Sequence, residues 1–119
     1  NFKMIKIFKT AKSLQDGIDN MMAGAKEDYA QTMGRNDSAY TKQKLENYES
    51  QTTVKEGKKY IKVIYDRSVF AFIVKEDFKH FRRGDVLKPA GWAAPALNQP
   101  RGNVLEGNYP IQWTGPLYL

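Results

Sequence analysis

The sequence predicts an α+β fold. One or two N-terminal helices pack on a small antiparallel sheet of three to four strands, and an irregular, aromatic-rich C-terminal tail seals the other face of the sheet. Apolar residues recur every three or four positions before residue 34, and they alternate with polar residues after residue 59. The tail after residue 89 is rich in Pro and Gly but keeps spaced aromatic rings, whereas disordered tails are poor in aromatics. We therefore expect an ordered tail.

The longest helical pattern begins after Ser13, whose hydroxyl can cap a helix, and Asp16 follows near the positive end of the helix dipole. Gly34 is a candidate C-terminal cap. Gly17 and Gly24 each weaken a helix by about 1 kcal/mol relative to Ala. The apolar residues with helical spacing are Leu14, Ile18, Met21, Met22 and Ala25.

Residues 2–12 are basic and contain no acid. Their lysines recur every third residue, so a helix would carry them as one stripe beside an apolar stripe of the same spacing. A short strand is the alternative, which we favour less because the apolar residues do not alternate cleanly. A basic stripe suits an acidic partner or an anionic surface. The two stripes are Lys3, Lys6, Lys9 and Lys12, and Phe2, Ile5 and Phe8.

A second helix is expected after the polar turn at residues 35–38, with Asp37 or Ser38 as its N-cap. Its apolar residues are few, so a loop or an edge strand stays open for this segment. The residues that favour a helix are Tyr40, Gln43, Leu45 and Tyr48.

The sheet is expected from residue 52 onward. Residues 52–54 are β-formers, and Glu56-Gly57 is typical of a turn. Residues 60–66 alternate in polarity, which predicts a strand with two unlike faces. The apolar run at 69–74 predicts a strand buried on both faces. The two strands pair most simply as an antiparallel hairpin.

The last predicted strand is short. Residues 75–83 are charged and form a loop or a single helical turn, and Gly84-Asp85 then turns the chain. Val86–Lys88 is expected to form a strand that ends at Pro89, which has no N–H to give to the ladder.

The composition limits the class of protein. With 119 residues, 41% of them hydrophobic, and with no linker or repeat, the chain is expected to form one globular domain over residues 1–119. The absence of cysteine excludes disulfides and thiol chemistry and favours a cytoplasmic protein. No apolar run approaches the roughly 18 residues of a membrane span. Because the chain begins with Asn rather than Met, we expect residues before Asn1.

The residues do not suggest catalysis. His80 is the only histidine and lies in a charged segment, so we expect it at the surface rather than as a catalytic base or a zinc ligand. Asp66, Asp77 and Asp85 would bind magnesium only if the fold brought them together, and nothing in their spacing requires that. No glycine-rich phosphate loop is present. We therefore expect no enzyme, no metal and no cofactor.

The charge favours binding instead. Nineteen Lys and Arg face 13 Asp and Glu, and the net charge of +6 suits anionic partners such as nucleic acid, or serves only to keep the protein soluble. Single-strand binding needs cations for phosphates and rings for bases. The alternative places Trp92 and Trp113 in the core and the cations on its solvated rim. The candidates for binding single-stranded nucleic acid are Lys79, Arg82, Arg83, Lys88, Trp92 and Arg101.

Four short segments carry a family resemblance. They read G-D-V-x-K-x-A-x-W-x-A-P-A and then R-G-N, after a strand of S-V-x-x-F type, and they are similar to a family of small uncharacterised tailed-phage proteins. Gly91 stands where that pattern has Ser, Ala93 stands where it has Lys, and residues 76–83 lengthen the preceding turn. The matching segments are Ser68–Ile73, Gly84–Trp92, Ala94–Ala96 and Arg101–Asn103.

The resemblance implies a viral origin and a place in the cytoplasm of the host cell, but no activity. The residues themselves suggest that the block from Gly84 to Asn103 is a structural clamp, in which Arg101 hydrogen-bonds loop carbonyls. Two functions then follow as hypotheses. The first is an accessory protein that binds nucleic acid. The alternative is a small interaction protein that binds and modulates a host protein through its N-terminal helix.

Overall fold

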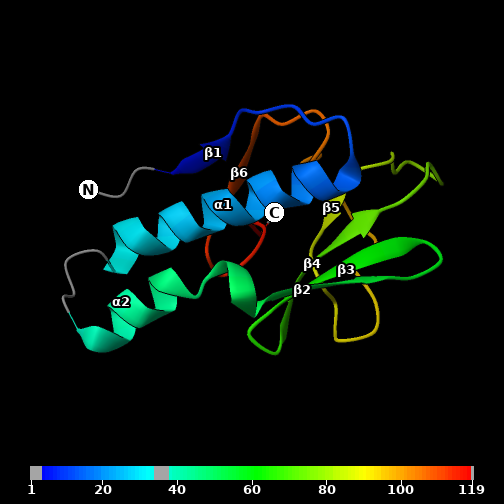
Figure 1. The fold of residues 1–119 in the computed structure, drawn as a ribbon. Coiled ribbons are helices and arrows are strands. Elements are labelled where there is room, and N and C mark those ends of the chain that lie inside the picture. The colour runs from blue at the N-terminus through cyan, green and yellow to red at the C-terminus, as the bar shows by residue number, and fades with distance from the viewer. Residues whose placement is uncertain (1–3, 34–37, 119) are drawn as a thin grey trace.

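The computed structural model describes residues 4–33 and 38–118, and it confirms the α+β class (Figure 1). A two-stranded sheet pairs β1 with β6, and a four-stranded sheet has the order β2-β3-β4-β5. The elements are β1 (Ile5–Ile7), α1 (Leu14–Met33), α2 (Ala39–Glu46), the 3-10 helix η1 (Glu49–Gln51), β2 (Thr52–Glu56), β3 (Tyr60–Tyr65), β4 (Ser68–Val74), β5 (Val86–Leu87) and β6 (Tyr109–Ile111).

Helix α1 runs through the middle of the molecule, between the β1–β6 pair and the rest of the fold (Figure 1). The Ser13 hydroxyl accepts a hydrogen bond from the Asp16 N–H at 3.1 Å, which confirms the predicted cap. All five apolar residues predicted for its inner face are buried, and Tyr29 joins them. The predicted C-terminal cap, Gly34, lies outside the described residues.

The N-terminal segment is a strand, so the prediction of a helix there is wrong. Ile5 and Ile7 are buried while Lys6 is exposed, which is the period of a strand. Phe8, expected on an apolar helical stripe, is 73% exposed. The strand forms because β6, near the other end of the chain, supplies its hydrogen-bonding partner. Phe2 and Lys3 lie outside the described residues.

Two glycines on α1 let neighbouring chain segments approach closely. A methyl group at Gly24 would overlap Ile7 of β1, and one at Gly17 would overlap the backbone and side chain of Val104. From the sequence alone, these glycines indicated only a loss of helix stability. Their role is to bring β1 and the C-terminal segment against the helix backbone.

The second helix is confirmed. The Ser38 hydroxyl accepts a hydrogen bond from the Thr41 N–H at 3.1 Å, and the other cap candidate, Asp37, lies outside the described part of the chain. Tyr48 follows the helix and is 1% exposed, with its ring stacked on Tyr65 of β3 at 4.5 Å between centroids. This ring pair joins α2 to the sheet.

The four-stranded sheet confirms the predicted hairpin. β3 and β4 are antiparallel and joined by Asp66 and Arg67, both with positive φ, as the tightest hairpin turns require. β4 is buried on both faces, as predicted. Ala71 and Ile73 belong to the main core beneath α1, and Phe72 and Val74 belong to a second cluster on the outer face.

The tail is ordered, but the prediction that it seals the outer face of the sheet is wrong. Of its described residues, only Trp92 and Ala93 are placed beside that face, and the later residues pack on the other side. Val104, Tyr109 and Ile111 join the main core on the helix side. The outer face is covered by the loop at residues 75–83, through Phe78 and Phe81. The later part of the tail packs on the helix side because β6 pairs with β1, which itself lies on α1.

We predict that Gly24→Ala destabilises the protein although alanine favours helix. Overpacking against Ile7 should cost about 1–3 kcal/mol, which exceeds the gain of about 1 kcal/mol in helix propensity. Chemical denaturation followed by circular dichroism measures the free energy of unfolding. Gln31→Ala, at an exposed site of the same helix, is the control and should change it by less than about 0.5 kcal/mol. A stabilised Gly24→Ala protein would contradict the close packing of β1 on α1.

Candidate functional site

The structure does not bring the six predicted binding residues together. Lys79, Arg82 and Arg83 lie in or beside the loop that covers the outer face of the sheet. Lys88 and Arg101 lie near each other at the C-terminal segment. Trp92 lies beside β3.

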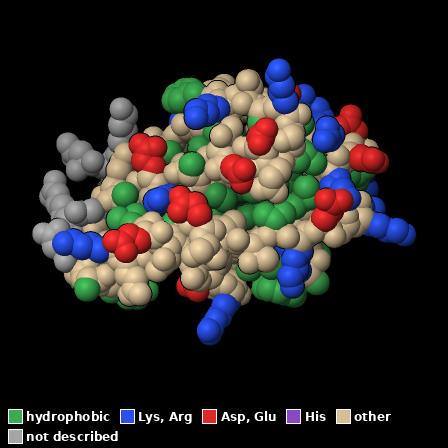
Figure 2. Space-filling model, in the orientation of Figure 1, with side chains coloured by type: hydrophobic (Ala, Val, Ile, Leu, Met, Phe, Trp, Pro, Cys, Tyr) green, Lys and Arg blue, Asp and Glu red, His purple; other side chains and the backbone are tan. Residues whose placement is uncertain are grey.

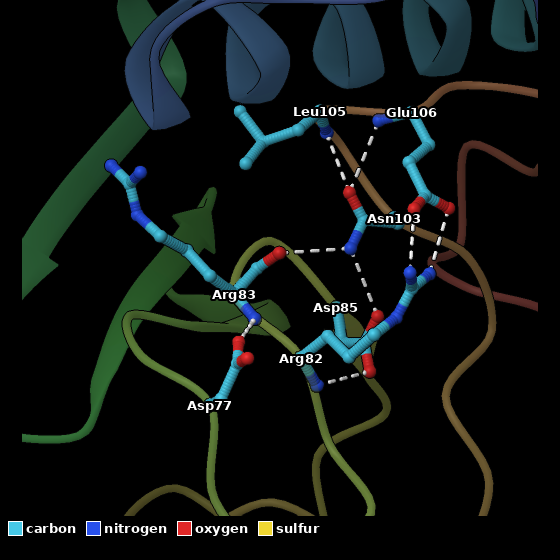
Figure 3. Close-up of polar contacts among 7 residues, drawn as sticks. All are labelled: Asp77, Arg82, Arg83, Asp85, Asn103, Leu105 and Glu106. Atoms are coloured by element: carbon cyan, nitrogen blue, oxygen red, sulfur yellow. Dashed lines mark hydrogen bonds and ion pairs between the residues drawn. The ribbon is translucent and has the colours of Figure 1, made fainter.

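One of the three loop cations, Arg82, is paired with an acidic side chain, whereas Arg83 is bound to one only through its backbone (Figure 3). The Arg82 guanidinium forms a two-point ion pair with the Glu106 carboxylate, with N–O distances of 2.7 and 2.8 Å, and the pair raises the pKa of Arg82. The backbone N–H of Arg83 donates to Asp77 at 2.7 Å, while its guanidinium points away from the cluster in Figure 3. Lys79 is exposed and has a positive φ of 50°. Arg82 is thus already neutralised within the chain.

Asn103 is the centre of the network in Figure 3. Its side-chain N–H groups donate to the Arg83 carbonyl at 2.9 Å and to the Asp85 carboxylate at 3.0 Å. Its side-chain oxygen accepts from the N–H groups of Leu105 and Glu106, at 2.9 and 3.1 Å. The amide therefore uses both donors and both acceptor positions inside the chain.

The hydrogen bonds of the block from Gly84 to Asn103 fit the predicted clamp. Asp85 is 3% exposed and also accepts from the Arg82 N–H at 2.9 Å. The backbone of residues 101–104 pairs with that of residues 84–86 through three hydrogen bonds of 2.8 to 2.9 Å. Arg101 donates to the Gln99 carbonyl at 3.1 Å, in agreement with its predicted contact to a loop carbonyl. These hydrogen bonds join residues 84–86 to residues 101–104.

Lys88 is also occupied within the chain. Its ammonium donates to the Pro116 carbonyl at 2.6 Å and lies 4.0 Å from the centre of the Tyr118 ring. Burial lowers the pKa of Lys88, and the positive charge of Arg101 lowers it further. Lys88 therefore secures the C-terminal segment rather than facing the solvent as a free cation.

A different set of lysines lies on the outer face of the sheet. A shallow groove of about 240 Å³ runs beside the β2–β3 hairpin, and we call it the sheet groove. Within the described residues, none of its lysines forms an ion pair, and its one acid, Glu56, is bound by Lys75 at 2.8 Å. Figure 2 shows Lys and Arg side chains projecting around the end of the molecule that holds this sheet. The groove is lined by Lys55, Glu56, Gly57, Lys58, Lys59, Tyr60, Lys62, Phe72 and Ala93.

The register of the sheet sets two lysines face to face. Lys55 of β2 is the direct partner of Lys62 of β3, so two cations share one face of the sheet. Like charges in this position destabilise a strand pair. An anion bound between the two ammonium groups would remove this repulsion.

Aromatic rings accompany the lysines. The Lys62 ammonium lies 4.5 Å from the centre of the Trp92 ring and 5.7 Å from that of Phe72. Trp92 is 53% exposed, so it lies beside the sheet but does not belong to the core. The other tryptophan, Trp113, is half-buried against the main core and packs edge-on to Tyr29. Of the two rings, Trp92 is therefore the one a ligand can reach.

The structure engages His80, Asp77 and Asp85 in separate hydrogen bonds. His80 is exposed, and its Nε2 is 2.9 Å from the Asn98 carbonyl oxygen. Asp77 and Asp85 are engaged with backbone N–H groups of Arg83 and Arg82. Over residues 4–33 and 38–118, no three His, Asp or Glu side chains gather as ligands for a metal ion. In the same ranges, no helix is long and apolar enough to cross a membrane.

Our sequence reasoning missed the lysines of the sheet groove. A signal was present, because Lys58-Lys59 follows the Glu56-Gly57 turn and Lys55 and Lys62 flank it. Only the register shows that the flanking pair meets on one face.

We predict that Asn103→Ala costs about 2–4 kcal/mol of stability. It removes one of the two hydrogen bonds to the buried Asp85 carboxylate and leaves the N–H groups of Leu105 and Glu106 without their acceptor. The free energy of unfolding from urea titration measures this. Asn98→Ala is the control, since Asn98 is exposed and its side chain makes one hydrogen bond, to Arg101. It should cost less than about 1 kcal/mol. Equal costs for the two variants would show that Asn103 has no special role.

One family model matches this chain. The Family of unknown function (DUF7717) matches residues 4–119, which is nearly the whole chain. No curated protein and no solved structure matches it. The family has no described activity that would assign the sheet groove or the Asn103 network. The chain belongs to DUF7717, a family of unknown function.

Proposed function

We propose that this protein binds single-stranded nucleic acid along the sheet groove. The observation that carries the proposal is the facing pair Lys55 and Lys62 beside the exposed ring of Trp92. Proteins that bind single strands combine cations along the backbone with rings on which bases stack. The groove has both, and its cations have no acidic partner among the described residues.

The chemistry favours a single strand over a duplex or a simple anion. A duplex keeps its bases stacked inside and offers no free base to Trp92, whereas a single strand does. A small anion would use the lysines but not the ring. In the proposed complex, Lys55 and Lys62 contact one phosphate, Lys58 and Lys59 extend the basic path at the turn, and Trp92 stacks on a base.

The six residues predicted from the sequence take different parts in this proposal. Trp92 keeps its role as a stacking ring. Lys79 is exposed and follows Phe78, whose ring packs against Tyr60 with 6.0 Å between ring centres, but it does not line the groove. Arg83 is exposed near the same loop. Arg82, Lys88 and Arg101 hold intrachain contacts and contribute little to binding.

We further propose that the protein is an accessory protein of tailed phages, and that it binds its ligand without catalysing a reaction. Its support is the resemblance of residues 68–103 to small phage proteins and the exposed position of the only histidine. Such a protein would act in the cytoplasm of an infected cell, where single strands arise during replication. A gene placed among replication functions would agree with this role, and one among structural virion genes would oppose it.

The first test compares two double variants with the same change in net charge. Lys55→Ala/Lys62→Ala should weaken binding of a labelled oligothymidylate and reduce its salt dependence, because each lost phosphate contact lowers the log–log slope by about 0.7. Lys12→Ala/Lys42→Ala removes two exposed lysines elsewhere and is the control. Fluorescence anisotropy over a range of salt concentrations gives both slopes. If both variants lost the same affinity for oligothymidylate, net charge alone would explain the loss. That result would contradict a binding site in the sheet groove.

The second test is a stability measurement on the protein alone. Lys55→Thr should stabilise the fold by about 0.5 kcal/mol, because it ends the repulsion with Lys62 and places a β-former in β2. The same variant should bind oligothymidylate more weakly. Thermal unfolding without ligand and anisotropy with it give the two values. A variant that is destabilised, or that binds as tightly as the unaltered protein, would argue against a functional lysine pair.

A further inference from the structure

Strand β1 has one free edge. Among the described residues its only strand partner is β6, where Pro110 lies opposite Lys6. Proline has no N–H, so Lys6 and Pro110 form a non-hydrogen-bonded pair of the antiparallel ladder. The N–H and C=O of Lys6 therefore point away from β6. They are available to a further strand on the other side.

A groove of about 350 Å³ lies beside this edge. One wall is the backbone and side chains of residues 5–9, and the other is a face of α1. The small, exposed Ala23 leaves room on that face, whereas the space over Gly24 is filled by Ile7 of β1. Asn20 and Glu27 lie along the same face. The room suits small apolar side chains of a strand laid next to β1.

The solvent side of β1 has a definite chemical character. Met4 and Phe8 are 56% and 73% exposed, and the exposed Lys6 lies between them with its ammonium 5.8 Å from the Phe8 ring. Figure 2 shows hydrophobic side-chain surface at the top of the molecule, next to β1. Lys9 and Lys12 continue the positive charge along the chain. An added strand would set its outward side chains beside these residues.

The charge decides which strand fits. A second copy of β1 in antiparallel pairing would bring a second set of lysines to the same edge, and like charges oppose such pairing. Acidic outward side chains would instead complement Lys6 and Lys9. The inward ones should not be acidic, because Glu27 borders the groove.

We propose that the free edge of β1 binds an extended segment of a partner protein in which small apolar residues alternate with acidic ones. The segment adds a strand to the β1–β6 sheet. Its apolar side chains enter the groove over Ala23, and its carboxylates face Lys6 and Lys9. Strand addition of this kind draws its affinity from backbone hydrogen bonds and its specificity from alternate side chains.

The test uses two labelled heptapeptides with blocked ends, one alternating Val and Glu, the other alternating Val and Lys. Fluorescence anisotropy should show at least about tenfold preference for the Val–Glu peptide, and Lys6→Glu/Lys9→Glu should reverse that preference. Ala23→Gln, which fills the groove without a charge, should weaken binding about tenfold, whereas Ala23→Ser should not. Equal binding of both peptides, binding of neither at millimolar concentration, or full affinity in Ala23→Gln would overturn the proposal.

A backbone measurement separates strand addition from attraction between charges. Hydrogen exchange followed by NMR should show slower exchange of the Lys6 amide when the Val–Glu peptide binds, because that N–H gains an acceptor. If the peptide bound without slowing exchange of the Lys6 amide, charge attraction alone would explain the binding. That result would contradict the added strand. Lys55→Ala/Lys62→Ala should bind the peptide as tightly as the unaltered protein does, which keeps this surface distinct from the sheet groove.

Discussion

The side-chain amide of Asn103 is the interaction on which the arrangement of both sheets depends. It joins the turn before β5, through Arg83 and Asp85, to the start of the C-terminal segment, through Leu105 and Glu106. That segment continues to β6, which pairs with β1 on α1. One fully hydrogen-bonded amide thus connects the edge of the four-stranded sheet with the N-terminal strand. Among the amino acids, Asn has the smallest side chain that combines two hydrogen-bond donors with two acceptor positions.

The sheet groove, which we propose as the binding surface, lies on the face of the sheet opposite the main core and outside the Asn103 network. The main core lies on the helix side, and the outer cluster around Phe72 needs only the loop at residues 75–83 to cover it. The β2–β3 hairpin can therefore carry facing lysines, Lys55 and Lys62, at a small cost in stability. Proteins accept such local conflicts where a ligand resolves them. The cations nearer the network, Arg82 and Lys88, have intrachain partners and serve the fold.

Sequence patterns predicted the structural features that depend on residues close together in the chain. The caps at Ser13 and Ser38 and the doubly buried strand β4 follow from a few adjacent residues, and the structure confirms them. Strand β1 was mistaken for a helix because its partner β6 lies at the far end of the chain, where no short window reaches. Arg82 was proposed for binding because its partner, Glu106, is likewise distant. The facing lysines of the sheet groove require the strand register, which a sequence pattern does not contain.

The most direct test of the central claim is an NMR titration of the ¹⁵N-labelled protein with a short oligothymidylate. The account predicts that the largest shifts fall on β2, β3 and the Trp92 indole N–H, with small shifts at Arg82, Lys88 and Asn103. It also predicts that the amides of β1 and β6 stay unchanged, because the Asn103 network is not altered by binding. Shifts centred on Arg82 and Lys88, or no shifts at low salt, would contradict the assignment of the sheet groove as the binding surface.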